Sequence, residues 1–253
     1  MSESAPSEKS EKPSAGRVAG MWAKEIAIVV IGALVASTLL RLFIAQMFVI
    51  PSGSMENTLL IRDRVMVQKV AGWSRGDVVV FRDTQGWLAD PEEETDPVRK
   101  ALIFIGLAPD ESSNHLIKRV IGLPGDHVKC CDSQGRITVN DDPLDETSYL
   151  YSSNGETVEP SAMSFDVVVP KDRIWVMGDH RNDSQDSRCH LTEGTGGMAA
   201  FVPIADVVGS AVAVVFPFDR WRGLSRPDTF AQVPEPASPA PDRPVIAGQT
   251  PVC

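Results

Sequence analysis

The feature that most constrains this chain is an apolar run near its N-terminus. Residues 26–40 carry no charge, and the apolar character continues past Arg41 to residue 48. A helix rises about 1.5 Å per residue, so a run of this length spans about 34 Å, enough for the ~30 Å hydrocarbon layer of a bilayer. Arg41 can extend its charged head along its aliphatic stem to the interface. The sequence therefore predicts one transmembrane helix over residues 25–48.

Two alternatives fit the same run less well. A cleaved signal peptide needs small residues directly after its apolar core, and the nearest small residues, at 33–37, lie inside the run. A buried helix of a soluble protein is the other alternative, and it fits less well because the run lacks the polar face of an amphipathic helix. The orientation of the span is left open by its flanking charges, because four Lys or Arg precede it and three follow closely.

The two ends of the chain and one internal stretch differ in composition from the rest. Residues 1–24 are rich in Ser, Glu, Lys, Pro and Ala, and residues 226–253 in Pro and Ala, so we expect two disordered tails. An insert at 91–114 holds three glutamates and then an apolar core at 101–108. That core is too short to cross a bilayer. It fits either a buried helix or strand, or a segment that dips into the bilayer surface.

The remaining part, residues 49–225, has the pattern of a mainly β domain. Short β-branched or alternating runs are bounded by Gly, Pro and Asp, and hardly any helical period separates them. This pattern is typical of an antiparallel sheet or barrel-like domain. The expected strands lie at 64–70, 77–81, 116–123, 126–140 (with a turn at 133–135), 165–170, 173–177 and 206–216.

Charge and cysteine content exclude some classes of protein. The formal net charge of −10 argues against nucleic acid as a partner, because phosphate contacts need clustered Lys and Arg. No pair of the four cysteines has the CxxC spacing of a zinc ribbon, so we expect no structural metal. Two states fit the cysteines: a disulfide from Cys189 to Cys130 or Cys131, or free thiols.

A serine and a lysine in the β domain are candidates for chemistry. Ser54 lies on a turn of small residues directly after the anchor, where it can meet an extended peptide, although such a turn is most often only a loop. Lys118 shares a strand face with Leu116, so burial of Leu116 would bury the ammonium too. A free lysine is neutral about once in 2,500 molecules at pH 7, and burial can lower its pKa by ~3–5 units. A desolvated Lys118 would therefore serve as a base near neutral pH.

A third segment, residues 177–188, is mostly polar or charged yet follows an expected strand. It fits a solvated acidic loop, or an ion-pair network that orders a site.

Four motifs follow the anchor in a fixed order. They are Ser52-Gly53-Ser54-Met55, the Arg-Gly-Asp-Val-Val-Val-Phe of residues 75–81, Lys118-Arg119 with the Gly-Leu-Pro-Gly-Asp of residues 122–126, and Gly178-Asp179 through Arg188. Together they resemble the ordered boxes of the type I signal peptidases, and the resemblance covers residues 26–220. It implies a mainly β signal peptidase domain with one N-terminal transmembrane helix.

The resemblance also implies roles for the matching positions. Ser54 matches the nucleophile and Lys118 the general base of a Ser-Lys dyad. Ser52 matches the serine that joins the Ser54 backbone N–H in the oxyanion hole, and Ser184 matches the residue that orients the lysine. Supporting ion pairs match Asp186 and Arg188, with Asp179 and Arg181 in the same scaffold; shallow substrate pockets match Ile50, Pro51, Leu116 and Ile117.

The family's activity sets the functional expectation. Such an enzyme is a membrane-bound serine endopeptidase that cleaves the signal peptides of exported (Sec or Tat) preproteins after Ala-X-Ala-like sites through an acyl-enzyme, without cofactor or metal. Its partners are signal peptides and membrane lipid. It spans the bacterial cytoplasmic membrane once, with the tail of residues 1–24 in the cytoplasm and the β domain on the extracytoplasmic side.

Two positions depart from the family pattern. Asn57 stands where proline is common, and His180 where asparagine is frequent. Related eukaryotic and archaeal enzymes use a histidine base, but theirs replaces the box lysine, which is present here as Lys118. Two other classes remain as alternatives: a Ser-Lys self-cleaving protease of the SOS-repressor type, which has a DNA-binding domain and no anchor, and an inactive membrane-tethered binding domain.

Overall fold

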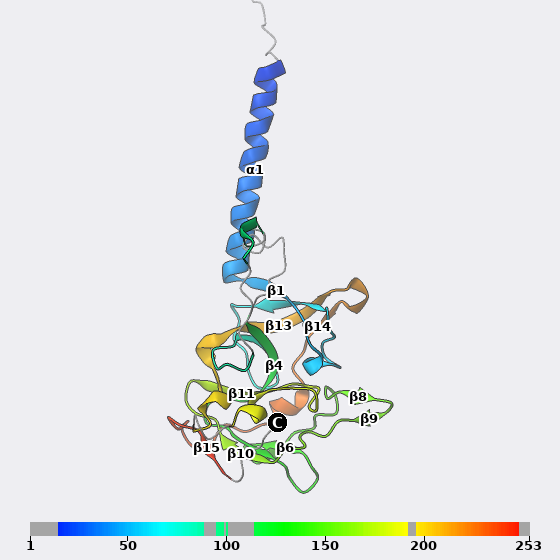
Figure 1. Cartoon of the computed structure of the whole chain (residues 1–253), viewed down its shortest axis with the longest axis vertical. Coiled ribbons are helices and arrows are strands. Elements are labelled where there is room, and N and C mark those ends of the chain that lie inside the picture. Colours follow the sequence, from blue (N-terminus) through cyan, green and yellow to red (C-terminus); the bar gives the residue numbers. More distant parts are fainter. Residues whose placement is uncertain (1–14, 89–94, 99, 101–113, 192–195, 248–253) are drawn as a thin grey trace, which may run out of the picture.

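A computed structural model describes residues 15–88, 95–98, 100, 114–191 and 196–247. Its first element is a long helix, α1 (Ala15–Phe43), which projects from a compact β domain (Figure 1). Within α1, the stretch Trp22–Leu39 is long and apolar enough to cross a membrane, and none of it is buried against the protein. An apolar helix surface that stays exposed among the described residues suits contact with lipid.

Both bounds of the helix differ from the predicted span of 25–48. The helix begins at Ala15, so residues 15–24 are helical and not part of the disordered tail expected over residues 1–24. It also ends before the apolar run does. Residues after Phe43 leave the helix and form strand β1 (Ala45–Val49), which pairs antiparallel with β2 (Arg64–Gln68). Phe48 and Ile50 pack into a core cluster of the β domain. The last apolar residues of the run therefore cover the sheet, and apolar content alone could not distinguish this burial from burial in lipid.

The strand next to α1 begins an eight-stranded antiparallel sheet. Its order is β1-β2-β13-β3-β4-β11-β12, and β14 pairs with β13. The bounds of the strands not yet given are β3 (Val78–Arg82), β4 (His115–Gly122), β11 (Arg173–Met177), β12 (Val202–Pro203), β13 (Val207–Phe216) and β14 (Arg222–Gly223).

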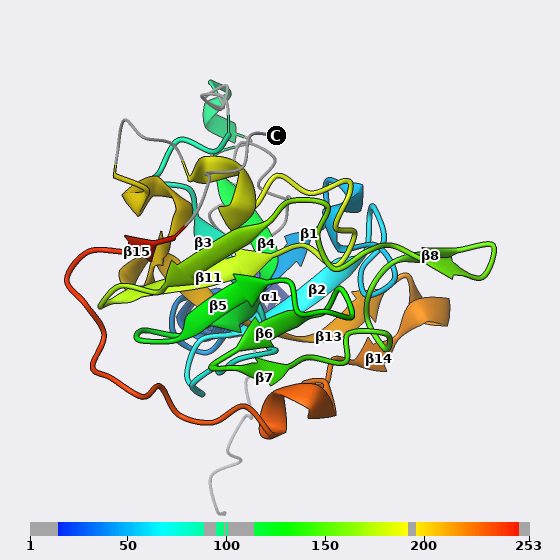
Figure 2. The same ribbon diagram turned by 90° about the horizontal axis from the view of Figure 1, so that it is seen from below.

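A second, five-stranded sheet lies on the side of the domain away from α1, in the order β15-β10-β5-β6-β7 (Figures 1 and 2). The largest core cluster joins the two sheets, with Val128 and Val167 from the second and Trp175 from the first. The strands are β5 (His127–Cys130), β6 (Ile137–Val139), β7 (Asp142–Pro143), β10 (Phe165–Val168) and β15 (Val245–Ile246); β8 (Ser152–Ser153) and β9 (Glu156–Thr157) form a separate hairpin.

Short 3-10 helices occupy the connections between strands. The one that matters for the site is η1 (Gly53–Met55), directly after β1. Further 3-10 helices among the described residues are η2 (Ser187–His190), η4 (Met198–Ala200), η5 (Ile204–Asp206), η6 (Phe218–Arg220) and η7 (Asp228–Ala231).

The predicted fold class is confirmed: the protein is mainly antiparallel β with one N-terminal apolar helix. Each predicted strand segment holds an observed strand, and the segment 126–140 folds as the hairpin β5–β6 around its expected turn. The predicted insert of 91–114 lies mostly outside the described residues, including its apolar core at 101–108.

The chain after residue 225 is not the disordered tail that its composition suggested. Phe230 and Val233 are buried in the largest core cluster, and β15 pairs with β10. Proline restricts φ but fits extended backbone, so a Pro-rich segment can pack along a surface when apolar side chains anchor it. The composition of the segment reveals its prolines, but it does not reveal that Phe230 and Val233 are buried in the core.

The cysteines also differ from both expected states. Cys130 and Cys131 are disulfide-bonded to each other. The expected bond from Cys189 to one of them is therefore not formed, although Cys189 is itself disulfide-bonded.

Candidate active site

Ser54 is presented by η1, a single turn directly after β1. The side chain of Met55 is fully buried beneath this turn, and the Leu59 N–H donates to the Met55 carbonyl at 2.7 Å. The Ser54 carbonyl accepts the His180 N–H at 3.1 Å, which ties the turn to the loop after β11. The turn is thus held from below and from the side, and the Ser54 side chain is 6% exposed.

Lys118 lies in β4, between β3 and β11, and faces Ser54. Its Nζ is 2.7 Å from the Ser54 Oγ, and the side chain is only 3% exposed. In the pairing of β3 with β4, Lys118 lies opposite Val79, and the side chain of Val79 is fully buried. Leu116, on the same strand face, is half-buried. The expected juxtaposition of serine and lysine is therefore present.

Burial lowers the pKa of Lys118 to about 8, because the ammonium loses its hydration. Asp186, Asp179 and Asp183 oppose this effect, while Arg188 adds to it. At a pKa near 8, about one molecule in ten carries a neutral amine at pH 7, compared with one in about 2,500 for a free lysine. A neutral amine beside a hydroxyl can take its proton, as a general base does.

Ser52 lies beside the same hydroxyl. Its Oγ donates to the Ser54 Oγ at 3.5 Å, a long contact. The structure therefore brings Ser52, the predicted oxyanion-hole serine, next to Ser54.

Ser184 reaches the site through a different partner from the one expected. Its hydroxyl donates to the Asp186 carboxylate at 2.8 Å, and no hydrogen bond among the described residues joins it to Lys118. A side chain at Gly178 would overlap both the Ser184 Oγ and the Ser54 carbonyl oxygen. Gly178 therefore lets the polar loop approach the Ser54 turn, and Ser184 lies close to the dyad without the predicted bond.

Asp186 and Arg188 form the expected ion pair. The guanidinium donates from Nε to Oδ1 and from Nη2 to Oδ2, each at 2.8 Å, and both side chains are buried. Asp186 also accepts the Gly178 N–H at 3.0 Å. Arg188 and these donors together hold the pKa of Asp186 below its usual value despite burial, so it stays a carboxylate.

Asp179 and Arg181 are buried in the same region, but each has another partner. Asp179 receives two hydrogen bonds from Arg119, at 2.8 and 2.6 Å, and Arg181 pairs with Glu146 at 2.5 Å. The Arg119 guanidinium also lies 4.3 Å from the centroid of the Tyr149 ring. Arg119, Glu146 and Tyr149 were not predicted as site residues, although Arg119 stands in a quoted motif.

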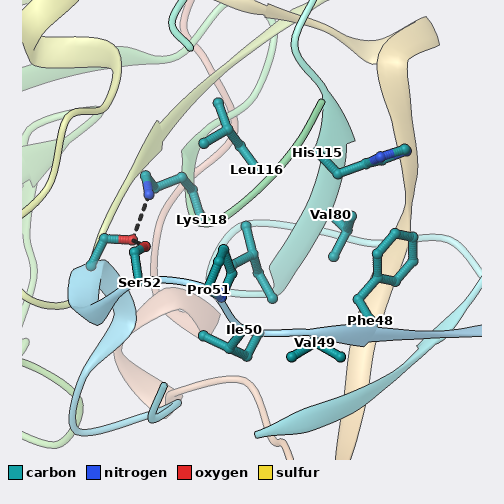
Figure 3. Close-up of a pocket in the computed structure, with 11 residues that line it drawn as sticks. Phe48, Val49, Ile50, Pro51, Ser52, Val80, His115, Leu116 and Lys118 are labelled. Carbon is teal, nitrogen blue, oxygen red and sulfur yellow. Dashed lines mark hydrogen bonds between the residues drawn. The ribbon is translucent and has the colours of Figure 1, made fainter. Parts of the chain in front are cut away.

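A cavity of about 170 Å³ opens next to the dyad (Figure 3). All four predicted substrate-binding residues line it: Ile50, Pro51, Leu116 and Ile117. Residues that the sequence did not single out complete the wall, namely Phe48, Val49, Val80 and His115. Alternation along β1 and β4 would have found most of them once the strands were paired.

The two departures from the family pattern have clear surroundings. Asn57 has a positive φ of 80°, which proline cannot adopt, and its amide donates to the Leu150 carbonyl at 3.0 Å. The His180 ring stacks on Tyr151 at 3.8 Å between centroids, and its Nδ1 lies 3.2 Å from the Glu56 carboxylate. The imidazole thus lies against Glu56 and Tyr151, and the side chain that contacts the Ser54 Oγ is Lys118.

A buried serine–lysine pair at the edge of an apolar cavity, on a mainly β domain, is the arrangement of a serine hydrolase. Comparison with known proteins gives the family. The family model described as "Signal peptidase, peptidase S26" matches residues 22–216. The chain therefore belongs to the signal peptidase family, peptidase S26, and is a hydrolase of the serine endopeptidase type.

The chain is also similar to individual named proteins. The chain is similar to a signal peptidase I of Mycobacterium tuberculosis, at 35% identity over 78% of this chain and 74% of that protein. A probable signal peptidase I of Mycobacterium leprae is 34% identical, with coverages of 81% and 79%. A crystal structure of a signal peptidase I from Enterococcus faecalis is 21% identical and covers 56% of this chain and 97% of its own, with a TM-score of 0.34.

Proposed function

We propose that this protein is a membrane-bound type I signal peptidase that removes signal peptides from exported preproteins, with Ser54 as nucleophile and Lys118 as general base. The observation that carries the proposal is the 2.7 Å separation of Lys118 Nζ and Ser54 Oγ in a buried site. Burial supplies the neutral amine that the chemistry needs, and the short separation supplies the proton path.

Acylation follows from this geometry. Neutral Lys118 takes the proton of Ser54 as its Oγ attacks the scissile carbonyl carbon. The oxygen of that carbonyl becomes an anion, which the Ser54 backbone N–H and the Ser52 hydroxyl can stabilise. Collapse of the tetrahedral intermediate breaks the C–N bond, and Lys118 gives the proton to the departing amine. The signal peptide is then held as an ester on Ser54.

Deacylation uses the same groups. With the amine product gone, Lys118 is again neutral and takes a proton from water that attacks the ester carbonyl. Lys118 returns this proton to Ser54 Oγ as the ester breaks, and the signal peptide leaves with a free carboxylate. Asp186 and Asp179, both held as ion pairs, help to support the loop that packs on the Ser54 turn.

The cavity supports the preference for Ala-X-Ala-like sites. Its volume of about 170 Å³ and its apolar wall of Ile50, Leu116 and Ile117 suit small uncharged side chains just before the scissile bond. A charged side chain placed there would lose its hydration without gaining a partner from these three residues.

The anchor and the domain surface near it support a membrane location. Where α1 ends and β1 begins, Phe43, Ile44 and Met47 are 65%, 47% and 61% exposed. Phe218 and Trp221 follow β13, which belongs to the same sheet as β1, and they are also strongly exposed. Apolar and aromatic groups in such positions suit the lipid interface. The active site would then lie on the extracytoplasmic side of the bacterial cytoplasmic membrane, where exported preproteins emerge, with the N-terminus inside.

The proposal is tested with the purified full-length protein in detergent micelles or vesicles. A preprotein with an Ala-X-Ala site is incubated with the wild type, Ser54→Ala and Lys118→Met, and the new N-terminus is sequenced. The wild type is expected to cut directly after the second alanine, and both variants to leave the preprotein intact. A preprotein with a bulky residue in place of the second alanine serves as the matched substrate control. Cleavage by either variant at the wild-type rate would reject the dyad.

A further inference from the structure

The C-terminal segment, residues 226–247, runs along the edge of the domain from η7 to β15 (Figure 2, orange to red). At its start, Arg226 donates two hydrogen bonds to Asp77, at 3.2 and 2.9 Å. Phe230, 5% exposed, packs directly on Gly76, where any side chain would overlap its ring. Gly76 has a positive φ of 86°, so two independent constraints favour glycine there. The segment thus covers the Arg75-Gly76-Asp77 motif.

Further along, the C-terminal segment covers a second motif. Pro236 and the Ser238 carbonyl lie within 3.3 Å of the position a side chain would take at Gly125. The Pro241 carbonyl accepts the Lys171 N–H at 2.8 Å, and β15 adds its two residues to β10. The contacts are spaced along the whole segment, so it is part of the folded domain.

The first covered motif is hydrogen-bonded to the part of β4 that follows Lys118. The Gly76 N–H donates to the Val120 carbonyl at 2.7 Å, and the Val120 N–H donates to the Asp77 carbonyl at 2.9 Å. The Gly76 carbonyl accepts Arg119 Nη1 at 2.6 Å. A contact that holds Gly76 in place therefore also holds the Val120 backbone and the Arg119 side chain, which follow the proposed base Lys118 along β4.

Phe230 reaches Arg119 by a second route. Its ring stacks on Tyr149, with centroids 6.1 Å apart, and the Arg119 guanidinium lies 4.3 Å from the centroid of the same Tyr149 ring. Arg119 in turn holds both oxygens of Asp179. Phe230 is therefore in contact with both groups, Gly76 and Tyr149, that set the position of Arg119.

We propose that Phe230 is a positioning residue for the peptidase reaction, and that the C-terminal segment acts through it to hold Arg119 on Asp179 beside the base strand. This inference rests on the proposed role of Lys118. Loss of the Phe230 ring would let Arg119 move, and Asp179 would then be less completely paired.

The direction of the effect follows from the charges around Lys118. Asp186, Asp179 and Asp183 favour its ammonium form, and Arg188 disfavours it. Asp186 keeps its ion pair with Arg188, and Asp183 is largely exposed. Loss of the Phe230 ring therefore changes chiefly the pairing of Asp179 with Arg119. A less well paired Asp179 attracts the ammonium more strongly and raises the pKa of Lys118. The pH at which cleavage switches on would rise with it.

The test compares three full-length variants with the wild type. Phe230→Ala removes the ring and its volume, and Phe230→Leu keeps much of the volume but cannot stack on Tyr149. Val233→Ala is the matched control, since Val233 is buried in the same core three residues further along the segment and has no ring. For each, kcat and KM for a preprotein are measured against pH well below the unfolding temperature, and folded protein is quantified by near-ultraviolet circular dichroism.

For Phe230→Ala and Phe230→Leu, we expect the acid limb of kcat/KM to move up by about half to one pH unit, with kcat at pH 7 about three- to tenfold lower per folded molecule. KM should hardly change. Val233→Ala should lose thermal stability but keep the wild-type limb. Two results would show that Phe230 is only structural and would overturn the inference. One is a Phe230→Leu variant with the wild-type kcat and the wild-type acid limb of kcat/KM; the other is a Phe230→Ala variant whose acid limb is unchanged. If the wild type itself showed no limb near pH 8, the proposed base would have failed first.

Discussion

The Nζ of Lys118 and the Oγ of Ser54 lie 2.7 Å apart, and the lysine is almost completely buried. Neither fact alone makes a base. A lysine hydrogen-bonded to a serine in water would stay charged at pH 7, and a buried lysine without a hydroxyl would have nothing to activate. The structure brings the two conditions together at the edge of an apolar cavity.

Removal of either member of the dyad should abolish cleavage. We expect Ser54→Ala and Lys118→Met each to lower kcat roughly 10⁴-fold or more, and the double variant to fall no further, because the two groups act as one unit. Single-turnover cleavage of a preprotein measures the effect. Additive losses in the double variant would show that the residues act independently.

The rate of cleavage should depend on pH through Lys118. Its pKa is lowered to about 8, and only the neutral amine can take the serine proton. The rate should therefore be constant above about pH 8 and fall about tenfold for each pH unit below it. The pH profile of kcat/KM measures this pKa for the free enzyme. An acid limb near pH 10 would indicate a hydrated lysine.

Lys118 should also cost stability at neutral pH. Its pKa is about 8 in the folded protein and 10.5 in the unfolded chain, so the unfolded state binds more protons between these values. The wild type is therefore destabilised by about 3 kcal/mol below pH 8, and this cost disappears as the pH rises to about 10.5.

Lys118→Met removes this cost, so we expect it to be more stable than the wild type at pH 7, with a difference that shrinks toward pH 10. Urea unfolding in detergent at several pH values measures it. Lys129→Met is the control, because Lys129 is half-exposed on the second sheet and should change stability by less than about 1 kcal/mol at any pH. A gain for Lys118→Met that did not vary with pH would contradict the assigned pKa.

The buried pair of Arg119 and Asp179 should be sensitive to loss of one partner. Arg119→Ala leaves the Asp179 carboxylate buried and only partly bonded, which should cost about 3–5 kcal/mol of stability. Arg136→Ala, which breaks a surface pair with Asp132, should cost far less stability. Thermal unfolding of the two variants provides the comparison. Equal losses of stability would refute the distinction between a buried and a surface ion pair.

His180 should be dispensable for the proton transfers. Its imidazole contacts Glu56 and stacks on Tyr151, so we expect His180→Ala to lower the cleavage rate by less than about tenfold. The same preprotein assay, run beside Lys118→Met, measures it. Cleavage that is lost in His180→Ala but retained in Lys118→Met would point to a serine–histidine enzyme instead.

Patterns with a short period were enough to predict much of the fold. The β4 segment with its Lys118 and the hairpin around the turn at 133–135 follow from alternation and turn residues, which are local properties. The proximity of Ser54 and Lys118 was expected from the resemblance of the ordered motifs to the family, and the structure places the two side chains in contact. By contrast, the end of α1 at Phe43 could not be predicted, because lipid and a sheet bury the same side chains.

The partners of buried charges were also beyond the sequence. Arg181 pairs with Glu146, and Asp179 with Arg119, each far away along the chain. Charge patterns show that such groups need partners, but pairing is decided by tertiary packing. The same holds for Phe230, whose single aromatic ring in a Pro-rich segment finds Gly76 only once the sheets have formed.

The central claim is that Lys118 is held close to neutral beside Ser54, and titration of that one amine tests it most directly. Nitrogen-15 NMR of lysine-labelled full-length protein in micelles, with Lys118→Met to assign the signal, gives its pKa. The account predicts a value near 8 that changes in Ser54→Ala, because the two groups are in contact. A value of about 10.5, unchanged by Ser54→Ala, would contradict it.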